Sequence, residues 1–224
     1  MWIELQKIIK FLLEYDELRQ IVVLTLKMSL FSTVLSTSFG IIIGVVLAIS
    51  PVNRKKKYIC RLINTLMGMP PVVAGLIVFL ILSRSGPLGE LKLLYTLQAM
   101  VIAQVVLITP IVAGLSNPIL EKKYFEIKET VRGLNISKIK QLYLLLHECK
   151  KPLIGILLSA FGRSIAEVGA VQLVGGNVQY KTRVMTTAIM LETNRGNFYF
   201  AVSLGVVLLL CSLIVNIVAS IISD

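Results

Sequence analysis

Two charged residues, Arg163 and Glu167, interrupt an apolar stretch long enough to cross a membrane. They are four residues apart, so one continuous helix would carry both on the same side. Arg163 follows Pro152 by about eleven residues, which at about 1.5 Å per residue puts it near the membrane middle. Charge at that depth is expected to face the bundle interior or a water-filled cavity. The pair is either a neutralised packing contact or a gate element. A binding site is disfavoured, because Glu167 would oppose any anion that Arg163 attracts.

Basic and hydroxyl side chains follow this stretch, in a segment that is too polar to span. Lys181, Arg183 and Arg195 could give a dianion a weakly basic mouth, or meet an acidic partner. The hydroxyl donors are Thr182, Thr186, Thr187 and Thr193. The alternative is an ordinary polar surface helix.

Motifs for enzyme chemistry are missing from the sequence. There is no phosphate-binding G-x-x-x-x-G-K-[ST], so we expect the chain not to hydrolyse ATP itself. His147 is the single histidine, and the three cysteines lack the spacing of a disulfide framework or a metal site. We therefore expect no catalytic residue, no metal and no cofactor in this chain.

Composition indicates a polytopic, all-α membrane protein. Hydrophobic residues are 56% of the chain, charged residues are 16%, and the mean hydropathy is +0.83. About twenty apolar residues cross the hydrocarbon layer, and five such stretches can be drawn. They are Ile21–Ile49, Leu62–Leu82, Leu93–Ile111, Pro152–Val174 and Phe198–Ile222. Pro70 and Pro71 should break the second, as is tolerated beside protein or a water-filled cavity. Gly40 and Gly44 form a G-x-x-x-G for close packing, within the chain or in a dimer.

Charge sets the expected orientation. Connections on one side of the spans carry thirteen Lys and Arg residues, against eight on the other. The positive-inside rule then puts the richer side in the cytoplasm, the N-terminus outside and the C-terminus inside. Residues 1–20 have helical apolar spacing but are too polar to span, which predicts an interfacial helix outside the cytoplasm. The transmembrane domain follows at 21–222. The net charge of +11 reflects this topology and not nucleic-acid binding.

A long basic insert, at about 118–150, separates the third and fourth spans. A simple chain reversal needs only a handful of residues, whereas this one holds two amphipathic helix patterns. Asn117 and Pro118 could begin the first, and Gly133 suits the position just past its end. Ile139, Leu142, Tyr143 and Leu146 form the second pattern. The helices either lie on the membrane surface or form a docking surface for a cytoplasmic partner.

The helix–Gly–helix insert resembles the coupling motif of type I ABC-importer permeases, which reads E-A-A, three residues, G, nine residues, then I-x-L-P. Gly133 is kept, but Glu126 lies seven residues before it, and Lys128 and Glu129 replace the alanines. Tyr143 replaces the later isoleucine, and Leu145–Leu146 stands for Leu-Pro. The resemblance implies coupling to an ATPase through a set of residues in the insert, namely Glu126, Glu129, Arg132, Gly133, Leu134, Ile139 and Tyr143.

A second match lies downstream, from Phe161 to Phe198. This segment is similar to oxyanion-importer permeases, in which R-x-x-G-E-F-G-A precedes a glycine turn and a T-x-x-A-I helix. The matching residues are Arg163, Glu167, Gly169, Ala170, Gly175, Gly176, Thr186, Thr187, Ala188 and Ile189. Ala166 and Val168 depart from G-E-F-G-A and favour the tungstate-type branch. Arg163, Glu167, Gly169, Thr186 and Thr187 are then the expected pathway or gate residues.

The resemblance, which covers roughly residues 20 to 220, implies the type I importer permease fold and an oxyanion importer subunit in the cell membrane, with tungstate the first choice of substrate. It also implies a homodimer, two ATPase subunits that bind ATP and Mg, and an extracytoplasmic oxyanion-binding protein. A molybdate or sulfate permease is the alternative within the family. A non-transporting membrane scaffold or a channel is the alternative outside it.

Overall fold

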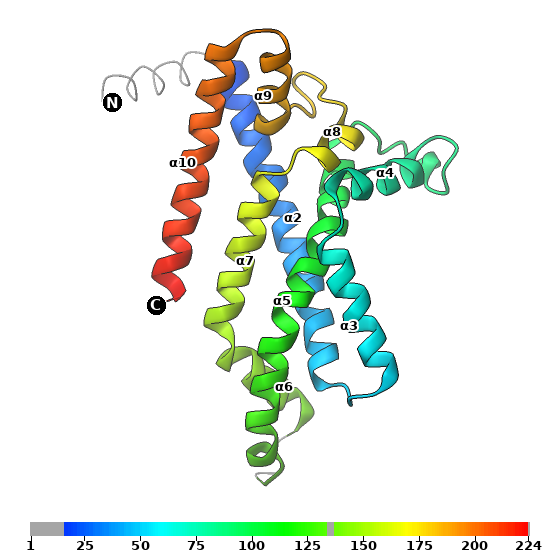
Figure 1. Ribbon diagram of the computed structural model, residues 1–224, viewed down its shortest axis with the longest axis vertical. Helices are drawn as coiled ribbons and strands as arrows, with labels where there is room; N and C mark the ends of the chain where they lie inside the picture. Colours follow the sequence, from blue (N-terminus) through cyan, green and yellow to red (C-terminus); the bar gives the residue numbers. More distant parts are fainter. Residues whose placement is uncertain (1–15, 134–136, 224) are drawn as a thin grey trace. The chain divides into compact units, whose positions relative to one another are not determined.

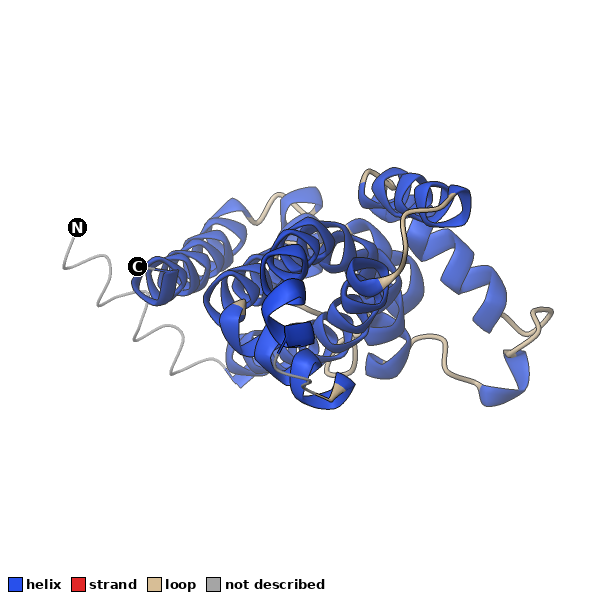
Figure 2. Ribbon diagram, turned by 90° about the horizontal axis from the view of Figure 1, so that it is seen from below, coloured by secondary structure: helices blue, strands red, loops and turns tan. Residues whose placement is uncertain are grey.

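The computed structural model describes residues 16–133 and 137–223, and every regular element within them is a helix (Figures 1 and 2). The all-α prediction is therefore confirmed for this part of the chain. The predicted interfacial segment, residues 1–20, falls mostly outside the described residues. The elements are α2 (Asp16–Ile49), α3 (Arg54–Met67), α4 (Pro71–Leu82), η1 (Gly89–Leu91), α5 (Leu97–Gly133), α6 (Lys138–Glu148), α7 (Lys150–Ile165), α8 (Gly169–Gly175), α9 (Met185–Asn194) and α10 (Phe198–Ser223).

Three of these helices hold a stretch long and apolar enough to cross a membrane, namely Glu17–Ile49, Leu97–Lys128 and Phe198–Val218. Two further crossings arise if α3 with α4, and α7 with α8, each count as one bent span. The prediction of five spans is met in this sense. Counted this way, the second and fourth spans are broken helices, and the break in the second lies at the predicted prolines.

Helix α5 differs most from the expectation. The sequence predicted a span that ends at Ile111 and a separate helix that begins at Asn117, but α5 runs unbroken through Pro110 and Pro118. Proline removes one backbone donor in each case, a loss that a long packed helix can absorb at the cost of a kink. Asn117 does not cap a helix, because it lies inside α5, and its side-chain amide donates to the Cys60 sulfur at 3.9 Å.

The chain divides into two compact units, and α2, α5, α7 and α10 contribute to both. Unit 1 contains Pro70–Gln104, Ser164–Ile214 and the described part of Met1–Ser32. Unit 2 contains Thr33–Met69, Val105–Arg163 and the described part of Val215–Asp224.

Unit 1 is built around α4 and α8, the short helices that follow the two breaks. A buried apolar cluster joins them to α2 and α5; its members are Met28, Val78, Leu82, Ala99, Met100, Ala103, Ala170, Val171, Val174 and Val184. Glycine lets α4 and α8 approach closely, since a Cβ on Gly75 would lie 2.7 Å from the Ala170 Cα.

Unit 2 packs α2 against α5 through the predicted G-x-x-x-G. A Cβ on Gly40 would lie 2.5 Å from the Val112 Cβ, and one on Gly44 would collide with the Ser116 hydroxyl. Both glycines therefore serve packing within the chain, which was one of the two roles expected from the sequence. Lys56 ties α3 to α5 through an ion pair of 2.8 Å with Glu121.

Candidate functional site

The break in the fourth span corrects the predicted Arg163–Glu167 arrangement. Helix α7 ends at Ile165, so Glu167 lies past its end and does not share a helical face with Arg163. The Glu167 carboxylate accepts a hydrogen bond of 3.2 Å from the Ala170 amide. A side chain that caps the next helix competes with continuation of the first, which accounts for the interruption. Glu167 is 3% exposed and belongs to unit 1, whereas Arg163 is exposed and belongs to unit 2.

Polar groups freed by this break find partners inside unit 1. The Ser164 carbonyl accepts hydrogen bonds from the Gln104 side-chain amide, at 2.9 Å, and from the Glu167 amide, at 3.3 Å. The Glu167 carbonyl accepts one of 2.9 Å from the Thr186 hydroxyl. Backbone groups at membrane depth must be satisfied by protein or water, and here protein side chains do so. The break is therefore a built feature of the fold.

Two threonines of α9 and one from the loop before it are part of this framework. Thr182, Thr186 and Thr187 are almost fully buried, so the alternative of an ordinary surface helix is wrong for them. The Thr187 hydroxyl donates to the Asn177 side chain at 3.0 Å and accepts from the Val184 amide at 3.1 Å. The structure thus brings together Glu167 and Thr186 of the predicted gate residues, and Thr187 fixes the start of α9.

Glycines complete the same region. Gly169 begins α8, and a Cβ there would lie 2.8 Å from Val72 of α4. Gly176 follows α8 with a φ of +66°, the left-handed conformation that ends many helices. The predicted glycine turn is therefore present at Gly176.

The sequence analysis did not single out a buried hydroxyl stripe on α2. Six residues at helical spacing are at most 4% exposed, namely Thr25, Ser29, Ser32, Thr33, Ser36 and Thr37. Ser32 joins the break, because its hydroxyl lies 2.8 Å from that of Ser164 and donates to Gln104. The repeat at three and four residues within an apolar span was the signal that could have revealed it.

The insert in unit 2 is formed by the end of α5 together with α6. The second predicted helix is confirmed as α6, and α5 ends at Gly133, where the sequence predicted a helix end. Lys123 of α5 pairs with Glu126 at 3.4 Å and with Glu148 of α6 at 3.2 Å. This link holds the two helices of the insert together.

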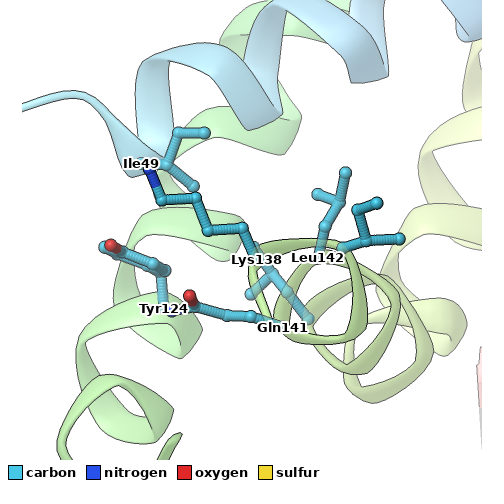
Figure 3. A pocket seen from close by; sticks show the side chains of 7 residues that line it. Ile49, Tyr124, Lys138, Gln141 and Leu142 are labelled. Atoms are coloured by element: carbon cyan, nitrogen blue, oxygen red, sulfur yellow. The ribbon is translucent and has the colours of Figure 1, made fainter. Parts of the chain in front are cut away.

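A hollow of about 410 Å³ lies between these helices and the end of α2 (Figure 3). Its lining is mostly apolar and comprises Ile49, Tyr124, Lys138, Ile139, Gln141, Leu142 and Leu145. Leu145 is fully buried and attaches α6 to the unit.

Helix α6 also carries exposed apolar side chains, and one of them, Ile139, lies at the rim of the hollow. Ile139 is 82% exposed and Tyr143, one turn later, is 71% exposed. The Tyr143 ring stacks on His147, with 6.0 Å between ring centroids. Of the other predicted coupling residues, Leu134 and the side chains of Glu129 and Arg132 lie outside the described part of the chain, and of Gly133 only the backbone is described. We call Ile139 and Tyr143 the α6 ridge.

Cys149 lies at the junction of α6 and α7. Burial raises the pKa of its thiol, and the Glu148 carboxylate adds to this while Lys123 opposes it. A buried thiol that stays protonated is a structural residue, not a reactive one.

The sequence matches, over residues 40–224, the family described as "Binding-protein-dependent transport system inner membrane component". A tungstate uptake system permease protein of Peptoclostridium acidaminophilum is 37% identical over 88% of this chain and 86% of its own length. One from Campylobacter jejuni is 37% identical over 73% of this chain and 68% of its own length. A sulfate transport system permease protein of Escherichia coli is 25% identical over 86% of this chain and 73% of its own length.

A solved structure is also similar. It is the crystal structure of a bacterial ABC transporter involved in the import of the acidic polysaccharide alginate, and a chain in it aligns with a TM-score of 0.70 at 16% identity. The alignment covers 97% of this chain and 84% of that one, which establishes a shared fold. With its broken spans, its helical insert and the family match, the chain belongs to the inner membrane components of binding-protein-dependent transport systems and is a multi-pass ABC-importer permease.

Proposed function

We propose that this chain forms, as a homodimer, the membrane pathway of an oxyanion importer, and that two separate ATPase subunits drive it. The observation that carries the proposal is the α6 ridge. Two large apolar side chains, Ile139 and Tyr143, are exposed on a helix that an ion pair and a buried leucine fix to α5. Exposed apolar surface on a rigid element is typical of a docking site.

The rest of the insert suits the same partner. Lys138 and Lys140 are exposed beside the ridge, so an acidic rim around an apolar cleft would complement it. Glu126, Glu129, Arg132, Gly133 and Leu134 complete the proposed coupling surface. ATP and Mg bind the ATPase partner in this scheme, and this chain holds no cofactor.

The breaks serve as the moving parts of the pathway. Helices α4 and α8 follow them and pack on each other, while Glu167, Gly169, Thr186 and Thr187 fix where α8 begins and how α9 meets it. Broken spans allow half-helices to tilt without stretching a continuous hydrogen-bond ladder. Arg163 is proposed as a further gate residue on α7.

Exposed apolar side chains on α4 support a second copy of the chain in the membrane. Val72, Leu76 and Leu80 are 56%, 47% and 57% exposed. Such a surface is covered by lipid or by a second permease subunit. The charge distribution supports a cytoplasmic insert and C-terminus, with the N-terminus outside. An extracytoplasmic binding protein then delivers the anion to the outer face.

Tungstate is the proposed substrate. Two relatives at 37% identity are named as tungstate uptake permeases, whereas the sulfate permease relatives are 25% to 28% identical. Molybdate and sulfate are the alternative anions of the same shape and charge.

Uptake of tungstate, molybdate and sulfate measured side by side tests this proposal. Cells that express the complete transporter and cells that lack this chain are compared at equal anion concentrations. We expect tungstate uptake to depend on the chain and to resist an excess of sulfate. Equal uptake of all three anions would remove the tungstate assignment, and uptake that ignores the chain would remove the importer.

A further inference from the structure

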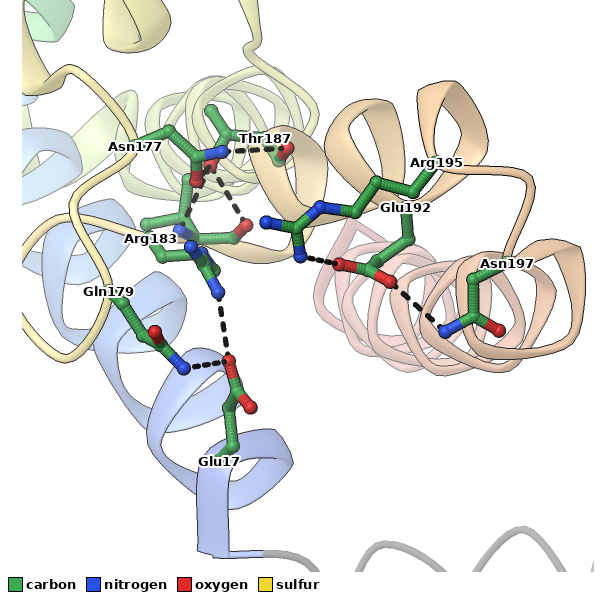
Figure 4. A network of polar contacts seen from close by, with 9 residues as sticks. Glu17, Asn177, Gln179, Arg183, Thr187, Glu192, Arg195 and Asn197 are labelled. Carbon is green, nitrogen blue, oxygen red and sulfur yellow. Dashed lines mark hydrogen bonds and ion pairs between the residues drawn. The ribbon is translucent and has the colours of Figure 1, made fainter.

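A small polar hollow in unit 1 lies between the start of α2, the loop before α9 and the segment that joins α9 to α10 (Figure 4). Its volume is about 220 Å³, which would hold a tetrahedral oxyanion with a few water molecules at about 30 Å³ each. The residues that line it include two arginines, two glutamates and two amides, namely Arg183, Arg195, Glu17, Glu192, Gln179 and Asn197.

Each carboxylate accepts hydrogen bonds from one arginine and one side-chain amide. Glu17 accepts hydrogen bonds of 2.9 Å from both Arg183 and Gln179. Glu192 accepts one of 2.9 Å from Arg195 and one of 3.0 Å from Asn197. The carboxylates therefore orient the arginines.

Donors remain after these bonds are counted. A guanidinium carries five N–H groups, and the hydrogen bonds among the described residues use one nitrogen of each arginine. The Arg183 Nε is buried and has no acceptor among the described residues. Each amide likewise has a second hydrogen to give.

Both guanidinium groups line this hollow, one from the loop before α9 and one from just past its end, and Figure 4 shows the Arg195 side chain extending toward Arg183. An anion between them would accept the remaining N–H groups by charge-assisted bonds. In the Arg195–Glu192 pair the arginine is 58% exposed and the glutamate 13%, so the guanidinium is the partner that can turn toward an anion.

We propose that this hollow is a transit site for a tetrahedral oxyanion such as tungstate. The inference rests on the proposed function, because it names the substrate class at this end of unit 1. The four charged residues sum to zero, so the anion is held by oriented donors and not by an excess of positive charge. Weak holding suits a transport pathway, in which an ion must leave as readily as it enters.

The test is cysteine protection in the purified full chain in lipid nanodiscs. The reporter is Asn197→Cys, which gives up one amide of the site and keeps both arginines and both carboxylates. It is labelled with a neutral methanethiosulfonate reagent, and modification at position 197 is read by peptide mass. Sodium tungstate should slow labelling by about threefold once most sites are filled, and sodium chloride of equal ionic strength should not. Arg183→Gln and Arg195→Gln should each abolish the protection, and Arg195 is exposed enough for its variant to fold.

Lys181→Gln is the matched control, because Lys181 is an exposed cation in the same loop that does not line the hollow. It should keep full protection. Protection by chloride, protection that survives Arg195→Gln, or no protection by tungstate would overturn the site. If the complete transporter takes up tungstate while position 197 is unprotected, the site is wrong and the importer stands. If position 197 is protected but no oxyanion is taken up, the site stands and the importer is wrong.

Discussion

A backbone carbonyl at the end of a broken membrane helix needs a hydrogen-bond partner from the protein or from a water-filled cavity. At the α7–α8 break that partner is a hydroxyl for Glu167 and a side-chain amide for Ser164. A single residue can therefore decide whether the break is stable. Two predictions belong to this scale.

Thr186→Val should destabilise the permease, because it leaves the buried Glu167 carbonyl without the Thr186 hydroxyl. The loss of one such partner costs about 1–3 kcal/mol, and thermal unfolding of the purified protein in detergent would report it as a fall of several degrees. Thr186→Ser keeps the hydroxyl and should unfold close to the parent. Equal stability of the Val and Ser variants would show that this hydrogen bond does not support the break.

Cys149 should react slowly with maleimide near pH 7, because burial hides the thiol and its raised pKa keeps it protonated. The rate should rise as the pH passes the usual thiol pKa of about 8.5 and continue to rise above it. Peptide mass mapping over a pH series, with the unfolded chain as the reference, measures this. A Cys149 that labels at neutral pH as fast in the folded as in the unfolded chain would contradict the buried position.

At the scale of elements, small residues decide how closely helices approach. Helix α2 meets α5 at Gly40 and Gly44, and α4 meets α8 at Gly75. Contacts this close bring backbones together and stabilise membrane bundles by dispersion.

Gly40→Ala should therefore destabilise the chain, since the new methyl group would press on the Val112 side chain. Overpacking of this kind costs about 1–3 kcal/mol. Gly205→Ala is the control, because a Cβ at Gly205 in α10 meets no described heavy atom within 4 Å. Unfolding midpoints in detergent should fall for Gly40→Ala and stay level or rise for Gly205→Ala. A fall of the same size in both variants would argue against a specific α2–α5 contact.

The α6 ridge predicts a loss of docking without a loss of folding. Tyr143→Ala removes a side chain that is 71% exposed, so the permease should fold normally but retain much less ATPase on co-purification, by about tenfold for an aromatic hot spot. Tyr58→Ala is matched to it, since Tyr58 of α3 is 67% exposed in the same unit. It should leave ATPase recovery unchanged. Normal ATPase recovery with Tyr143→Ala, or an equal loss of ATPase with Tyr58→Ala, would show that the α6 ridge is not the docking site.

Helices could be predicted from the sequence where the length of an apolar stretch agrees with the proline and glycine residues that end it. The proline break at Pro70 and Pro71, helix α6 and the glycine turn at Gly176 all followed from the sequence. The α7–α8 break did not, because its cause is a carboxylate that caps α8 and an amide from α5, a contact between residues sixty positions apart. The continuity of α5 was missed for a related reason. Packing along its length outweighs the local preference of Asn117 and Pro118 for a helix start.

At the scale of the whole molecule, the proposed permease must couple ATP hydrolysis in a separate subunit to movement of its own helices. In the proposed scheme, α6 of one unit docks the ATPase partner, and α4 and α8 of the other, which follow the two breaks, are the parts that move. A channel would need neither a docking helix nor a partner that hydrolyses ATP. The importer and the channel therefore differ in one measurable respect, the dependence of anion flux on ATP.

Flux into proteoliposomes measures this directly. Vesicles contain the chain alone or the chain with its ATPase, with ATP supplied to the ATPase side and tungstate-loaded binding protein on the other. We predict accumulation of tungstate only with the ATPase, the binding protein and hydrolysable ATP all present, and strong reduction with Tyr143→Ala. Tungstate entry through the chain alone, or entry that is equal with and without ATP, would contradict the account.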